Sequence, residues 1–263
     1  MKPTTKILIL SNTLAFLGVL IVNTLANALP LNGKSTGELS DQYPNLFTPA
    51  GLTFSIWGII YAWLIVFIGC QIAALFKPSF ATRMEPMIEK TGWLFFMTCL
   101  LNMSWMFAWH WEQVSLSVVI MTLFLGVLVQ LNVRIGNGHA ASGHLEKWIA
   151  HLPFGIYQGW ITVAIIANIT AFLVNTGWAG GSPGEATWAI IMTLTGAAVA
   201  IFLLLRQNNI GHGFAVAWAL LGIYLKRTSL PEVEDGGLAM VALIAALLVL
   251  AITLVRLPKW LKY

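Results

Sequence analysis

The sequence predicts an all-α, polytopic membrane protein: a bundle of about eight transmembrane helices. Of the 263 residues, 58% are hydrophobic and 9% are charged, whereas soluble domains carry about 25% charged residues. The mean hydropathy is +0.81. Apolar runs long enough to cross about 30 Å of hydrocarbon, at about 1.5 Å per residue, recur along the whole chain. We place these spans at 7–29, 50–76, 92–111, 114–135, 148–175, 187–205, 210–225 and 238–257.

Two of these runs need comment. The first is longer than a signal-peptide core, and Asn23 and Asn27 interrupt it where a cleavage site needs small residues. We therefore expect a retained helix rather than a cleaved signal. The seventh run, 210–225, is short and rich in Gly and Ala. Cys70 and Cys99 both fall inside apolar runs, so no disulfide framework is implied.

The positive charges predict the orientation. If the N-terminus is cytoplasmic and the chain crosses the membrane eight times, most of the 14 Lys and Arg residues fall on the inner side. Only Lys34, Lys226 and Arg227 fall outside. Positive residues are retained in the cytoplasm during insertion. We therefore predict a multi-pass protein of the inner cell membrane with both termini in the cytoplasm. The inner residues are Lys2, Lys6, Lys77, Arg83, Lys90, Arg134, Lys147, Arg206, Arg256, Lys259 and Lys262.

Two outer connections organise the chain. The long one, 30–48, suits either a lid over the bundle or a solvated connector. The turn-rich stretch 178–185 predicts a boundary between a five-helix unit, 1–177, and a three-helix extension, 178–263. The extension carries small residues four apart, which permit close packing within the chain or in a homodimer. These pairs are Gly196 and Ala200, Gly213 and Ala217, and Ala242 and Ala246.

The fifth run carries an inward-facing stripe. Trp160, Ala164 and Asn168 lie at i, i+4 and i+8, which is one face of a helix. A carboxamide in hydrocarbon has no water partner, so it must face protein, a ligand or trapped water.

Other helices place similar groups at the same depth, in the outer half of the bundle. Trp57 and Tyr61 share a face of the second run, and Asn102 and Trp105 share a face of the third. Trp57 and Asn168 each lie about 10 Å below the outer end, and Asn23 and Asn27 lie near that level in the first run. Two interpretations stay open. These residues line a ligand site, or the amides serve helix packing and the indoles serve interfacial belts.

The same residues resemble the tryptophan-rich sensory protein (TspO, or translocator protein) family. The resemblance rests on Pro49-x7-Trp57-x3-Tyr61, Asn102-x2-Trp105 and Trp160-x3-Ala164-x3-Asn168, which match the second, third and fifth helices of that family over about residues 7–175.

The chain also departs from the family pattern. Gly51 stands where the family has a Trp, Met106 and Phe107 follow Trp105 where it has a proline, and Pro153 is displaced by about one helical turn. The family is usually five helices, so three helices here are additional.

The resemblance implies a sensory or binding protein whose outer-half cavity, covered by the first loop, holds a flat apolar ligand. The ligands that the resemblance implies are tetrapyrroles, such as protoporphyrin IX or haem, and sterol-like molecules. Beyond such a ligand, no cofactor is assigned. The implied ligand-binding residues are Asn23, Asn27, Pro49, Trp57, Tyr61, Asn102, Trp105, Trp160, Ala164 and Asn168. Light-dependent porphyrin breakdown has been proposed for the family and is the enzymatic reading left open here.

Other functions receive less support. No Asp or Glu falls in the middle of a predicted span, which disfavours ion-coupled transport. Gln71, Gln130 and Gln158 could still line a neutral path, so a transporter of a neutral or lipid-like molecule is the alternative. We predict no catalytic residues, no metal site and no nucleic-acid partner. His110 is the one residue considered as an axial haem ligand, and an interfacial hydrogen-bonding role is preferred for it.

Overall fold

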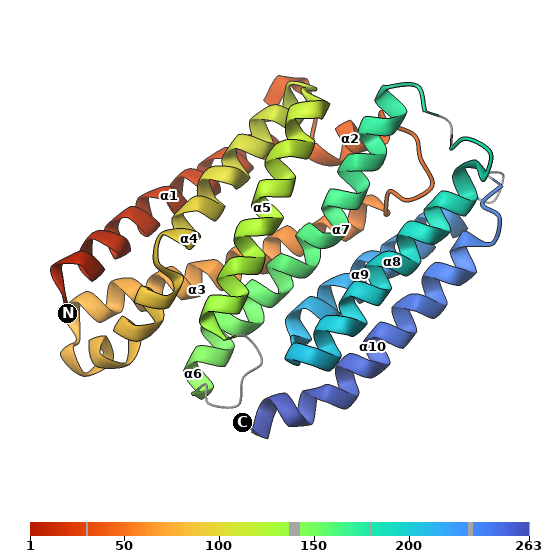
Figure 1. Ribbon diagram of the computed structural model, residues 1–263. Helices are drawn as coiled ribbons and strands as arrows, with labels where there is room; N and C mark the ends of the chain where they lie inside the picture. The colour runs from red at the N-terminus through yellow and green to blue at the C-terminus, as the bar shows by residue number, and fades with distance from the viewer. Residues whose placement is uncertain (30, 137–142, 179, 231–233, 263) are drawn as a thin grey trace.

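The structure is a computed structural model that describes residues 1–29, 31–136, 143–178, 180–230 and 234–262, without the side chain of Asn27. Within these ranges all regular elements are helices, most of them running along one bundle axis (Figure 1). The long helices are α1 (Pro3–Ala28), α3 (Ile56–Phe76), α4 (Pro78–His110), α5 (Val114–Ile135), α7 (Leu152–Asn175), α8 (Gly184–Gln207), α9 (Ile210–Thr228) and α10 (Leu238–Lys262). The short ones are η1 (Leu31–Gly33), α2 (Thr36–Asp41), η2 (Gly51–Ser55), α6 (His144–Glu146) and η3 (Lys147–His151).

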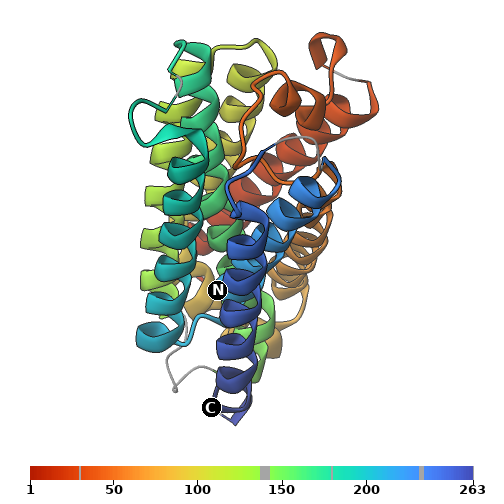
Figure 2. The same ribbon diagram turned by 90° about the vertical axis from the view of Figure 1, so that its right-hand side faces the viewer.

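Seven helical segments of the described chain are long and apolar enough to cross a membrane, and α9 is not among them. The protein is therefore an integral membrane protein. Although less apolar, α9 runs the length of the bundle between α7, α8 and α10 (Figures 1 and 2). No residue from Ile210 to Tyr224 is exposed. A helix shielded from lipid by its neighbours can carry fewer apolar residues, which accounts for the weak hydropathy signal of this run.

Helix α4 begins well before the predicted start at residue 92. Pro78 opens it, since proline is suited to the first helical turn. Gly92 then breaks it with a φ of 48°, a conformation that favours glycine. The charged stretch that precedes the third predicted span is thus helical, and it is bent against that span at Gly92.

Both termini lie at one end of the bundle, here called the terminal end (Figure 1). The Lys2 ammonium contacts Glu89 of α4 at 2.8 Å, and the Lys147 ammonium donates to the Trp260 carbonyl of α10 at 2.9 Å. The opposite end carries residues 31–50 and is here called the loop end. Which end faces the cytoplasm stays a prediction.

The connection between α1 and α3 packs over the loop end as a cap. Its own residues Leu39, Tyr43, Leu46 and Phe47 are buried. Helix α2 begins with a capping box, in which the Ser35 hydroxyl accepts from the backbone N–H of residue 38 and the carboxylate of that residue accepts from the Ser35 N–H at 2.7 Å. Of the two interpretations of this loop, the packed one agrees with the structure.

The cap is fastened to α4 by His110, which is fully buried. One ring nitrogen lies 3.0 Å from the Leu31 carbonyl and the other lies 3.2 Å from the Thr36 hydroxyl. The Asn32 amide donates to the His110 carbonyl at 3.0 Å. With both nitrogens engaged, His110 has a structural role here and offers no free nitrogen to a haem iron.

Helices α7 and α9 approach each other closely through glycines that the sequence analysis did not single out. A Cβ at Gly159 would lie 2.7 Å from the His212 carbonyl oxygen, and one at Gly155 would lie 3.2 Å from the Gly211 Cα. Of the predicted small-residue pairs, Gly213 faces Thr253 and Leu204 within the chain. The C-terminal helices therefore pack against the five predicted spans that precede residue 177, through the contact between α7 and α9. The division of the chain at residue 177 stays a prediction.

Candidate functional site

The predicted aromatic residues meet around Trp57, in the first turn of α3. Its ring stacks on Tyr61 at 5.4 Å and on Trp105 of α4 at 6.5 Å. Trp160 of α7 meets it edge-on at 6.1 Å. Stacked and edge-to-face pairs at such separations are favourable beyond their buried area. Three helices thus contribute to one ring cluster.

The amides of α1 and α4 form a hydrogen-bonded network beside these rings. The Asn23 amide donates to Asn102 Oδ1 at 2.8 Å, and the Tyr61 hydroxyl donates to Asn23 Oδ1 at 2.8 Å. The Asn102 amide donates to the Tyr157 hydroxyl at 3.0 Å. Satisfied polar groups of this kind are tolerated in a bilayer and fix the positions of the helices that carry them.

Asn168 belongs to a second hydrogen-bonded network, formed with Trp105 and Ser117. Its Oδ1 accepts from the Trp105 indole N–H at 3.0 Å, and its amide donates to the Ser117 hydroxyl of α5 at 2.8 Å. This contact orients the Trp105 ring, which in turn stacks on Trp57. The two networks are therefore joined through the rings.

A cavity of about 300 Å³ opens in front of this assembly, between α1 and α3 and beneath α2. Thr24 and Gly58 on its rim are exposed, so it opens on the outer surface of the bundle. Its lining residues are Leu20, Asn23, Thr24, Thr36, Gly37, Phe54, Trp57, Gly58, Tyr61 and Met106. Of the predicted site residues, Asn23, Trp57 and Tyr61 thus form a wall.

Other predicted residues lie behind that wall. Asn102, Trp105, Trp160 and Asn168 are buried and do not line the cavity. The Trp160 side chain is 2% exposed, and its indole N–H finds no hydrogen-bond acceptor in the part of the chain that the structure describes. These residues hold the wall in place rather than contact the space in front of it.

Two predicted residues lie elsewhere. Ala164 is half-buried in α7 and does not line the cavity. Pro49 is buried ahead of η2, where the next residue, Ala50, donates its N–H to the Gly222 carbonyl of α9 at 3.0 Å. Pro49 therefore belongs to the segment that anchors the start of α3. The side chain of Asn27 lies outside the described residues.

Several residues of the site were not predicted from the sequence. Tyr157 lies one turn before Trp160 on the predicted stripe, so extending that stripe backwards would have found it. Phe54, which meets Trp160 edge-on at 5.7 Å, lies in the 3-10 turn η2. Thr36 comes from the cap, and no periodicity of the sequence places a loop residue over a particular helix.

The described residues contain no group of three or more His, Cys, Asp or Glu side chains placed to hold a metal ion. The side chains that line the cavity offer indole, phenol and phenyl rings, an amide, hydroxyls, a thioether and an aliphatic group. Such groups bind by stacking and hydrogen bonding.

A family model described as TSPO-like protein matches residues 7–255. No curated protein and no solved structure matches the chain. The family match runs through the site residues and continues through α8 and α9 into α10. On this match over nearly its full length, the chain belongs to the TSPO-like protein family.

Proposed function

We propose that this protein binds a flat apolar ligand in the cavity between α1 and α3. Its family and its helices make it a membrane protein of the sensory or binding kind in general. The observation that carries the finer proposal is the cavity wall, where the stacked pair Trp57 and Tyr61 lies beside the Asn23 amide. Rings offer a planar molecule a stacking surface, and the amide offers its edge a hydrogen bond.

The size of the cavity bears on the ligand. Small-molecule sites range from about 300 to 1,000 Å³, and this one has about 300 Å³. A compact planar molecule fits with the cap in place. A tetrapyrrole such as protoporphyrin IX, or haem, or a sterol-like molecule needs α2 to move outward, and α2 is a short helix held by side-chain contacts with the end of α4.

The direction of the opening supports an apolar ligand. The rim residues Thr24 and Gly58 lie on the outer surface of α1 and α3, which faces acyl chains in a membrane. A ligand dissolved in the bilayer would therefore reach Trp57 laterally without crossing water.

Gly58→Leu tests the proposal. A Cβ at Gly58 meets nothing within 4 Å, so a leucine is accommodated by the helix and occupies the space in front of Trp57. Gly69→Leu is the matched control, because Gly69 is also exposed, is equally unobstructed and lies on nearly the same face of α3, about 16 Å along it.

Protoporphyrin IX is titrated into detergent-solubilised protein, and binding is followed by the absorption of the porphyrin. We expect it to bind Gly58→Leu about tenfold or more weakly than the unmodified protein, because the variant loses one stacking surface. Gly69→Leu should bind like the unmodified protein. If Gly58→Leu binds as tightly as Gly69→Leu and the unmodified protein, the ligand binds elsewhere. Parallel titrations with cholesterol and a bicyclic aromatic acid rank the ligand class. Saturable binding without flux in sealed vesicles separates a binding protein from the transporter alternative.

A further inference from the structure

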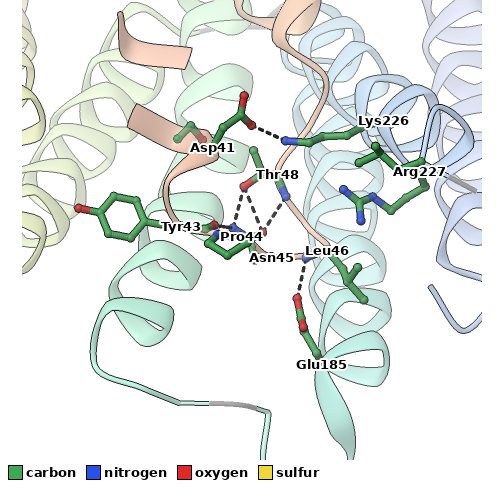
Figure 3. A pocket seen from close by; sticks show the side chains of 11 residues that line it. Asp41, Tyr43, Pro44, Asn45, Leu46, Thr48, Glu185, Lys226 and Arg227 are labelled. Atoms are coloured by element: carbon green, nitrogen blue, oxygen red, sulfur yellow. Dashed lines mark hydrogen bonds and ion pairs between the residues drawn. The ribbon is translucent and has the colours of Figure 1, made fainter. Parts of the chain in front are cut away.

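A second, larger cavity lies at the loop end and shares no lining residue with the first. It has a volume of about 440 Å³ and is lined by the cap between residues 40 and 48, by the first turn of α8, by the last turn of α9 and by Leu230. Figure 3 shows Lys226 and Arg227 entering it from α9 and Glu185 entering it from α8. Its volume is within the range of small-molecule sites.

Arg227 is the unusual residue of this cavity. Its side chain is 6% exposed, and its Nε finds no hydrogen-bond partner in the described chain. The guanidinium also takes part in none of the ion pairs found among those residues. In Figure 3 it points toward the cap segment that carries Leu46 and Thr48. Leaving a buried donor without an acceptor is costly, so the Nε–H of this guanidinium is available to an acceptor group that none of the described residues supplies.

The neighbouring charges are already engaged. The Lys226 ammonium lies 2.6 Å from Asp41 Oδ1, at the exposed edge of the cavity. The Glu185 carboxylate accepts the Leu46 N–H at 2.8 Å and so holds the cap to α8. Glu185 and Asp235 act on Arg227 electrostatically, but neither forms an ion pair with it among the described residues, so its Nε–H is left as an unused donor. Arg227 lies in the last turn of α9, where the helix dipole favours a cation. The dipole does not, however, provide a hydrogen-bond acceptor for the Nε of the side chain.

We propose that this cavity binds a carboxylate or phosphate group through Arg227. The planar guanidinium fork matches two oxygens of either group. Leu46 and Leu230 supply apolar surface in the same cavity, so the anion would be carried on an apolar body. Two sources have this chemistry: the head group of an anionic phospholipid and a soluble organic acid.

The test uses the full chain in detergent, with thermal unfolding followed at constant ionic strength during titration with inorganic phosphate or with hexanoate. A ligand that binds only the folded state raises the unfolding temperature. We expect a saturable rise for the unmodified protein and, for Arg227→Gln, an apparent affinity lower by about tenfold or more. Arg206→Gln is the control, because Arg206 also ends a helix but is exposed and outside the cavity. It should behave like the unmodified protein.

A second measurement, with phospholipid, identifies the source of the anionic group. Native mass spectrometry of protein purified from phosphatidylglycerol vesicles should show lipid retained by the unmodified protein and by Arg206→Gln but lost from Arg227→Gln. Retained lipid with no response to the soluble probes assigns the site to a head group, and the reverse assigns it to a soluble acid. If Arg227→Gln does not fold, Arg227→Lys should bind more weakly than the unmodified protein. The proposal is overturned if the unmodified protein responds to none of the probes, or if the Arg227 variants match it.

Discussion

At the scale of single residues, polarity in an apolar setting was the informative signal. Asn168 had to face a partner because hydrocarbon offers none, and in the structure that partner is protein: Trp105 and Ser117. The direction of the side chain could therefore be predicted from its spacing. The partner could not, because Ser117 belongs to another helix and no periodicity marks it. Ala164 shows the opposite case, since its spacing on the stripe did not place it at the cavity.

Asn168→Leu should destabilise the protein. Leucine keeps the branched shape but leaves the buried indole N–H of Trp105 without an acceptor, at a cost of about 1–2 kcal/mol. Denaturant titration in detergent micelles measures it. Asn175→Leu is the control, because Asn175 is exposed on nearly the same face of α7 and should tolerate the change. An unchanged midpoint for Asn168→Leu would mean that the Trp105 contact contributes nothing.

At the scale of elements, length and apolar composition predicted the long helices, and the boundaries moved where local chemistry intervened. Helix α4 extends back to Pro78 because a charged stretch can still be helical when it lies at the membrane surface. Helix α2 was missed, since it has a single large apolar residue, Leu39, and is placed by a capping box and by His110 rather than by a hydrophobic period.

His110→Ala should loosen the cap without disturbing the spans. It removes the contacts to the Leu31 carbonyl and the Thr36 hydroxyl, so α2 opens more often. We expect amide hydrogen exchange in residues 36–41 to accelerate by about tenfold or more while α5 stays protected. His144→Ala, an exposed histidine at the terminal end, provides the comparison. If exchange in α2 is the same in both variants, His110 does not fasten the cap.

At the scale of the whole molecule, the C-terminal helices support the candidate site. The Ala50 N–H donates to the Gly222 carbonyl, and the Trp218 indole donates to the Thr53 carbonyl at 3.0 Å. Helix α9 thus holds the segment that leads into Trp57. A turn-rich stretch in the sequence suggested a division into two units, but it carries no information on how closely the parts on either side of it pack.

The glycines between α7 and α9 make this integration testable through substitutions of opposite expected sign. A methyl group at Gly159 would lie 2.7 Å from the His212 carbonyl oxygen and 2.9 Å from the Ala215 Cβ, so Gly159→Ala must push two helices apart. The neighbours are backbone and a short side chain, which cannot turn away, and such overpacking costs about 1–3 kcal/mol. Gly126→Ala, on the exposed face of α5 with nothing within 4 Å, should instead gain up to about 1 kcal/mol from helix propensity.

Thermal unfolding of both variants, read together with protoporphyrin IX affinity, measures how far the disturbance spreads. If α9 carries the start of α3, Gly159→Ala weakens ligand binding as well as stability, although it lies outside the cavity lining. Gly126→Ala should leave binding unchanged. A destabilised Gly159→Ala with unaltered affinity would show that the wall around Trp57 is held by α1, α3 and α4 alone, and that the C-terminal helices contribute stability without shaping the site.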